Sequence, residues 1–151
     1  MDPFTERISR HSIVCLDTTV FIYHFESNPA YLPLTHALFT LIESGRLRAV
    51  TSTSTLLEII VRPLSMGRED IARKYEALLV NFPHLDILDL DRDVMRQAAR
   101  LRAQYHLRPP DALQVSACLL GGATAFATND RHLERIKDQL DIVILEDFVN
   151  T

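Results

Sequence analysis

Five short apolar segments alternate with longer helical segments along this 151-residue chain, and that alternation restricts the fold it can adopt. Each segment has the length of a strand, and most are apolar throughout, as in strands that are buried on both faces. Such strands, separated by helices, pair in parallel. We therefore predict an α/β sandwich around a mainly parallel five-stranded sheet. The expected strands are residues 13–16, 48–51, 85–90, 123–128 and 142–145.

The segments between these strands show the spacing of amphipathic helices. The clearest case is an i, i+4, i+7, i+8, i+11 series made by Ile71, Tyr75, Leu78, Leu79 and Phe82. Pro63 is expected to end the helix that follows the second strand, because proline lacks the amide hydrogen that a helix interior needs. The remaining helices are expected near residues 34–42, 94–105, 111–120 and 130–140.

The length favours one domain over residues 12–151, with residues 1–11 as a disordered or cloning-derived tail. No apolar run is long enough to cross a bilayer, and the first residues do not form a signal peptide, so we expect a cytoplasmic protein without a membrane partner. Cys15 and Cys118 are then expected to be free thiols in the core. The six histidines show no metal-ligand spacing, which argues against zinc.

Acidic residues stand where the expected strands and helices change over. Asp17 and Asp130 follow two strands, Asp111 follows Pro110 at a helix start, and Glu58 lies about one turn into a helix. Taken singly, each could be a helix cap or an exposed acid. Because ligands bind at the carboxyl ends of the strands in open α/β sheets, we expect the four to converge there.

Carboxylates that converge must take up protons or bind a cation. An all-oxygen site suits Mg²⁺ or Mn²⁺, which activates water and neutralises charge in phosphoryl chemistry. The hydroxyl of Thr128 could support the site. The chain has no glycine-rich nucleotide loop, and its net charge of −4 argues against a protein that coats nucleic acid.

The segments LDTTVFI (16–22), TLLEII (55–60), PPDALQVSACLL (109–120) and ATNDRHL (127–133) together resemble PIN-domain ribonucleases, especially VapC-type toxins of type II toxin–antitoxin systems. The resemblance spans roughly Ser12 to Val149. It implies a PIN-like three-layer α/β/α sandwich whose acidic quartet is Asp17, Glu58, Asp111 and Asp130, with Thr128 as the supporting hydroxyl.

The resemblance further implies a Mg²⁺- or Mn²⁺-dependent endoribonuclease toxin, dimeric and inhibited by a VapB-like antitoxin. Asp17, Asp111 and Asp130 are the expected metal ligands, and Glu58 is either a ligand or the base that holds the water. Cationic side chains near these segments are weaker candidates for RNA contact: Arg62, Arg68, Arg108 and Arg131. The alternative is a PIN-like interaction module without catalysis. A receiver domain and a haloacid-dehalogenase-type phosphatase are disfavoured, since Asp17 has no acidic neighbour of the kind that either needs.

Overall fold

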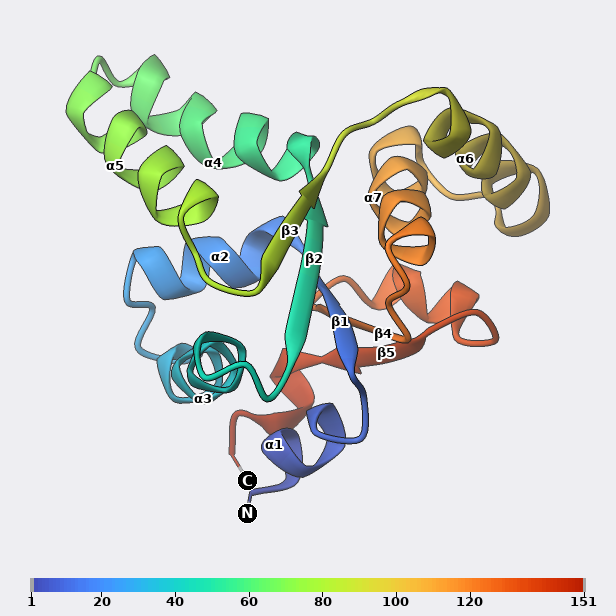
Figure 1. The fold of residues 1–151 in the computed structure, drawn as a ribbon, viewed down its shortest axis with the longest axis horizontal. Helices are drawn as coiled ribbons and strands as arrows, with labels where there is room; N and C mark the ends of the chain where they lie inside the picture. The colour runs from blue at the N-terminus through green and yellow to red at the C-terminus, as the bar shows by residue number, and fades with distance from the viewer. Residues whose placement is uncertain (1, 151) are drawn as a thin grey trace.

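Parallel strands form the centre of the molecule. The computed structural model describes residues 2–150, and Figure 1 shows its strands as one twisted sheet. The strand order is β3-β2-β1-β4-β5, and each neighbouring pair is parallel, which confirms the predicted fold class. The strands are β1 (Ile13–Leu16), β2 (Arg48–Ser52), β3 (Leu85–Leu88), β4 (Ala125–Thr128) and β5 (Asp141–Ile144).

Helices cover both faces of this sheet, so the domain has three layers (Figure 1). One face carries α1 (Pro3–Ile8), α2 (Thr18–Phe25) and α3 (Leu32–Glu43). The other face carries α6 (Arg92–Tyr105), α7 (Pro109–Leu120) and the short 3₁₀ helix η1 (Arg131–Ile136). A second 3₁₀ helix, η2 (Leu145–Phe148), follows β5. The antiparallel pair α4 (Thr53–Ser65) and α5 (Glu69–Val80) extends away from the sheet, at the upper left of Figure 1.

Successive residues of the central strand pack on opposite faces of the sheet. Val14 and Leu16 belong to the core beneath α1, α2 and α3, whereas Cys15 belongs to the core beneath α6 and α7. All three side chains are fully buried. Full burial of one such aliphatic side chain contributes about 1.5–3 kcal/mol, which explains why β1 is apolar throughout. Both cores therefore hold the residue that follows β1 in a fixed position.

A disulfide joins Cys15 of β1 to Cys118 of α7, with a Cα–Cα distance of 5.6 Å. The expectation of two free thiols was therefore wrong. It rested on the rarity of disulfides in this class of protein, whereas the pairing depends on α7 lying directly over β1. In the chain-entropy model, closing a loop of this length stabilises a fold by about 4–5 kcal/mol, and the two cysteines are 103 residues apart.

The N-terminal segment is an ordered helix, which corrects the expectation of a disordered tail. Phe4 and Ile8 of α1 are buried in the core, and the Phe4 ring meets that of Phe148 at a centroid distance of 5.5 Å. Arg7 Nε donates to Asp141 Oδ2 at 3.3 Å, which fastens the helix to β5. Phe4 and Ile8 are two apolar residues in an otherwise mostly polar segment, which is too few to predict an amphipathic helix. Met1 of the expected tail and Thr151 of the expected domain lie outside the described residues.

Two helix boundaries also differ from expectation. Pro63 lies inside α4, which continues to Ser65, so only the last turn is affected by the missing amide hydrogen. The helix expected over 130–140 is the 3₁₀ helix η1, in which Leu133 and Ile136 are buried three residues apart, the period of that helix. Within residues 2–150, the helices are too short or too polar to span a membrane.

Candidate functional site

The strand order changes direction at β1, which lies between β2 and β4. The chain moves outward from β1 through β2 to β3 and then returns to β4 on the other side of β1. In open parallel sheets, the crevice at such a switch point is the usual ligand site. Asp17 directly follows β1, and Thr128 is the last residue of β4. The topology thus brings two of the predicted residues to the edge where sites form.

Hydrogen bonds fix the carboxylate of Asp17 at this edge. Thr128 Oγ1 donates to Asp17 Oδ2 at 2.6 Å, and the Thr18 amide donates to Asp17 Oδ1 at 2.8 Å. The second bond makes Asp17 the N-cap of α2. Thr128, itself fully buried, also accepts a 3.0 Å hydrogen bond from the Asp130 amide. The predicted supporting hydroxyl therefore connects two of the predicted acids.

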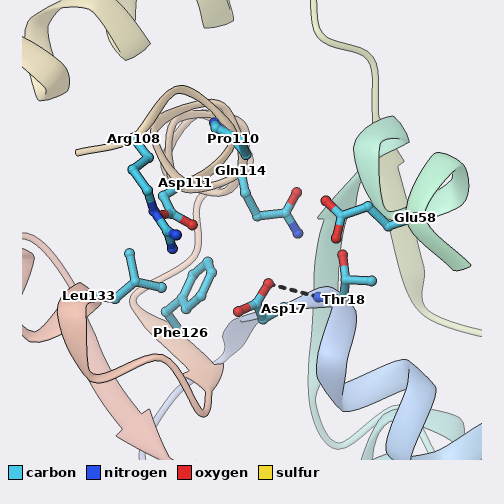
Figure 2. Close-up of a pocket in the computed structure, with 9 residues that line it drawn as sticks. All are labelled: Asp17, Thr18, Glu58, Arg108, Pro110, Asp111, Gln114, Phe126 and Leu133. Atoms are coloured by element: carbon cyan, nitrogen blue, oxygen red, sulfur yellow. Dashed lines mark hydrogen bonds and ion pairs between the residues drawn. The ribbon is translucent and has the colours of Figure 1, made fainter.

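Three of the four predicted acids line one pocket of about 370 Å³, shown in Figure 2. Asp17 comes from the end of β1, Glu58 from α4 and Asp111 from the first turn of α7. The helix α7 begins at Pro109, because a proline at the first helical position already has the required backbone angle and needs no hydrogen-bond acceptor. Pro110 contributes to the pocket wall together with Asp111, so the Pro-Pro pair both starts the helix and supplies one residue of the lining.

Arg108 links the fourth acid to this pocket. Its Nε donates to Asp111 Oδ2 at 3.0 Å, and its Nη2 donates to Asp130 Oδ2 at 3.2 Å. The Arg108 side chain is 69% exposed, whereas those of Asp111 and Asp130 are 21% and 26% exposed. An exposed guanidinium thus bridges two partly covered carboxylates. Figure 2 shows Arg108 and Asp111 side by side across the pocket from Glu58.

The pKa of Asp17 is raised, chiefly because burial removes water from its carboxylate. Hydrogen bonds from Thr128 and Thr18 act in the opposite direction, while the negative charges of Asp111 and Asp130 raise the pKa further. The pKa of Glu58 is also raised, first by loss of solvent at its pocket-facing carboxylate and then by the charge of Asp17. These two carboxylates therefore carry an electrostatic cost that a nearby cation would reduce.

Gln114 is a site residue that the sequence reasoning missed. It is buried, and its Nε2 donates to Thr51 Oγ1 at 2.9 Å and to the Leu16 carbonyl at 3.2 Å. Its Oε1 accepts a hydrogen bond from Ser54 Oγ at 3.0 Å. The side chain therefore ties α7 to the ends of β1 and β2 and to the start of α4, beneath the pocket. A polar residue on the apolar face of the 109–120 helix was the signal that could have revealed it.

The acidic side chains of this pocket offer carboxylate oxygens as metal ligands, and such ligands fit a hard divalent cation. Within residues 2–150, no three His, Cys, Asp or Glu side chains are close enough together to hold one ion between them. A positive charge is nevertheless present at Asp111 and Asp130, where the Arg108 guanidinium bonds to both. The acidic pocket thus already accommodates one cationic group, the guanidinium of Arg108.

The other candidate RNA-contacting arginines lie elsewhere. Arg62 and Arg68 line a separate cavity at the α4–α5 turn, and Arg62 approaches Glu26 at 3.9 Å. Arg131 Nη2 donates to Asp147 Oδ1 at 2.5 Å. Of the four candidates, Arg108 is the one that lines the acidic pocket.

Comparisons with known proteins concern the family and the fold. A model of the PIN domain family matches residues 14–139. A search of the curated proteins found no match. Among solved structures, VapBC2 from Rickettsia felis bound to a DNA fragment from its promoter has a TM-score of 0.68 and 17% identity, over 86% of this chain and 96% of that chain.

Two further structures give similar values. DNA-bound VapBC from Salmonella typhimurium has a TM-score of 0.62 and 23% identity, over 87% of this chain and 97% of that one. VapBC-5 from Mycobacterium tuberculosis has a TM-score of 0.57 and 24% identity, over 88% and 98%. At these identities the likeness concerns the fold.

Proposed function

The chain belongs to the PIN domain family, and from that premise we propose that it is a metal-dependent endoribonuclease toxin of the VapC type. The observation that carries this proposal is the convergence of Asp17, Glu58 and Asp111 in one open pocket, with Asp130 joined to it through Arg108. A pocket of carboxylates suits phosphodiester hydrolysis, in which charge must be neutralised and a water deprotonated. No covalent nucleophile is then required.

Asp17, Asp111 and Asp130 are the residues that would hold Mg²⁺ or Mn²⁺, once the Arg108 guanidinium had left the latter two and the three carboxylates had moved closer together than they lie here. The ion would supply positive charge that polarises the phosphodiester and stabilises the attacking and leaving oxygens. Thr128 and the Thr18 amide fix both oxygens of Asp17, so that its carboxylate keeps one orientation. Before the ion binds, Arg108 neutralises Asp111 and Asp130.

Glu58 has two possible roles in this scheme, as a ligand or as a base. As a base it takes one proton from the water whose oxygen attacks phosphorus, while the bond from phosphorus to the leaving oxygen breaks. Its raised pKa suits such an acceptor, because a base is most effective when its pKa is close to the working pH. Gln114 holds α7 to β1 and β2, and so fixes the position of Asp111 on α7 relative to Asp17 at the end of β1.

The proposal includes an RNA substrate, a VapB-like antitoxin and, from the family resemblance, a homodimer. The VapBC structures reported above are toxin–antitoxin complexes, and two of them are bound to DNA. We therefore place the protein in the cytoplasm, where such a complex would reach a promoter. Burial of Cys15 and Cys118 would limit the access of cytosolic thiols to their disulfide.

The antitoxin would cover an exposed apolar stripe on α4. Leu57, Val61 and Leu64 have i, i+4, i+7 spacing and are 64%, 53% and 42% exposed. Apolar side chains grouped in this way mark protein–protein contacts. Coexpression with the adjacent reading frame, followed by purification of the complex, would test this partnership; a Leu57→Asp, Val61→Asp variant should lose the copurified protein.

The central test is cleavage of a mixed single-stranded RNA pool by the purified chain with Mg²⁺ or Mn²⁺. We expect cleavage that EDTA abolishes and that Asp17→Asn reduces by at least a hundredfold without loss of the fold. Asp89→Asn is the matched control, because Asp89 is an exposed acid that follows the edge strand β3. Full activity of Asp17→Asn, or cleavage that persists in EDTA, would contradict the proposal. Absence of cleavage by the wild type would favour the interaction module instead.

A further inference from the structure

A second cavity, of about 150 Å³, adjoins the acidic pocket and is lined mainly by arginine and histidine side chains. Arg108 and Asp111 line both cavities, so the two are neighbours. The rest of the second lining is His106, Leu107, His132 and Arg135. Two arginines and two histidines around a single carboxylate make this cavity suited to an anion. The acidic pocket next to it is suited to a cation.

The backbone beside this cavity is held in an unusual conformation. His106 ends α6 with φ 58° and ψ 39°, the left-handed region. Residues other than glycine are rarely found in this region, because the conformation costs them about 1–2 kcal/mol. Buried Leu107 anchors the turn, and Arg102 Nε donates to the Leu107 carbonyl at 3.1 Å. The turn therefore presents His106 and Arg108 in fixed positions, at the expense of local strain.

Arg135 of η1 contacts the same turn. Its Nη1 donates to the His106 carbonyl at 3.3 Å, which holds the guanidinium at the cavity wall. One such bond occupies one of the five N–H donors of an arginine. The side chain is exposed, so that its other donors can be reached from solvent. A planar guanidinium held in this way is well suited to a phosphate, which accepts paired hydrogen bonds.

We propose that the cavity formed by His106, Arg108, His132 and Arg135 is a subsite for an RNA phosphodiester that flanks the one cleaved in the acidic pocket. This inference rests on the proposed function, because it assigns the neighbouring cavity to the same RNA strand. An RNA backbone that approaches the carboxylates is repelled by them. A cationic subsite one cavity away offsets that repulsion and orients the strand without reading its sequence.

The test measures RNA binding without catalysis. A fluorescein-labelled single-stranded oligoribonucleotide of mixed sequence is titrated with protein in EDTA, and its anisotropy is recorded at several salt concentrations. We expect Arg135→Gln to raise Kd about three- to tenfold. The slope of log K against log salt should fall by about 0.7, the value for one lost phosphate contact on a single strand.

Two further variants separate charge from structure. Arg135→Lys keeps the charge but not the planar guanidinium, so that it should restore the salt slope. Arg46→Gln is the matched control: Arg46 is exposed and precedes β2, at the opposite edge of the sheet, so its Kd should stay within twofold of wild type. A thermal melt for each variant establishes that it is folded.

The outcomes distinguish the two proposals. A Kd for Arg135→Gln equal to that of the wild type, or an equal loss in Arg46→Gln, would overturn the subsite. A folded wild type that binds no RNA at low salt would overturn it as well. If the wild type fails to cleave RNA with Mg²⁺ while Arg135→Gln still weakens binding selectively, then the proposed catalysis fails and the phosphate subsite stands.

Discussion

Thr128 Oγ1 lies 2.6 Å from Asp17 Oδ2 and joins the end of β4 to the end of β1. The same hydroxyl accepts the amide hydrogen of Asp130 at 3.0 Å. One fully buried side chain therefore sets the distance between two acids that come from distant parts of the sequence.

Substitution of this threonine should test how far the site depends on that distance. Thr128→Val keeps the shape but removes the hydroxyl, so that Asp17 Oδ2 and the Asp130 amide each lose this hydrogen bond, while Asp17 Oδ1 keeps the bond from the Thr18 amide. We expect the rate of RNA cleavage to fall about tenfold or more, which corresponds to an increase of about 1.4 kcal/mol or more in the activation free energy. Thr128→Ser retains the hydroxyl and should keep most of the activity. Equal activity of the Val and Ser variants would show that the hydrogen bond has no role.

The raised pKa of Asp17 predicts an unusual effect of pH on stability. The folded chain holds the Asp17 proton more tightly than the unfolded chain, so this stabilising contribution is complete below the ordinary pKa of 3.8. This contribution to the free energy of unfolding is lost as the pH rises through the raised pKa of Asp17 in the folded chain. At neutral pH, Asp17→Asn should therefore melt a few degrees above the wild type in EDTA, since asparagine also caps a helix.

The difference between the two melting temperatures should narrow as the pH is lowered toward 5. Thermal melts followed by circular dichroism between pH 5 and 8 would measure it, with Asp89→Asn as the control. A variant that melts below the wild type at neutral pH would contradict the assignment of Asp17 as a carboxylate destabilised by burial.

Arg108 should compete with a metal ion for Asp111 and Asp130. Removal of its guanidinium in Arg108→Gln should tighten Mn²⁺ binding about three- to tenfold, because the ion no longer displaces an ion pair worth up to about 1 kcal/mol. Isothermal titration calorimetry measures this directly. RNA binding in EDTA should weaken in the same variant. Weaker Mn²⁺ binding would instead identify Arg108 as a support for the acids.

Gln114 should be important for stability. Gln114→Leu leaves the Leu16 carbonyl and the hydroxyls of Thr51 and Ser54 without this partner, at a cost of about 2–4 kcal/mol. Gln104→Leu, on the exposed side of α6, is the control and should change stability by less than about 0.5 kcal/mol. Urea unfolding would compare the two variants. A cost for Gln114→Leu as small as that of the control would mean that water replaces the lost hydrogen bonds.

The strands and most helices were predictable because their signals are local. Runs such as 13–16 specify burial on both faces, and Asp17 could be assigned to the carboxyl edge of the sheet without knowledge of its neighbours. The placement of Glu58 and Asp111 beside Asp17 followed from the same reasoning about the sheet edge.

Contacts between distant segments were not predictable. The Gln114 network and the Cys15–Cys118 bond depend on how α7 lies over β1, which no local pattern encodes. Arg108 was predicted as a candidate for RNA contact near the site, but its ion pairs with Asp111 and Asp130 were not. Its pairing with Asp130 depends on the left-handed turn at His106, where histidine takes a conformation usually adopted by glycine.

The bond between Cys15 and Cys118 encloses a long stretch of the chain that includes Glu58, Asp111 and the exposed α4–α5 turn. A single cut by a protease anywhere within that stretch would leave two fragments that are still covalently joined. The sheet and the acidic pocket could then persist in a nicked molecule. Trypsin cleavage at exposed Arg68, for instance, would be seen on a gel only after reduction. In an oxidised sample, an intact band alone would therefore not establish an intact chain.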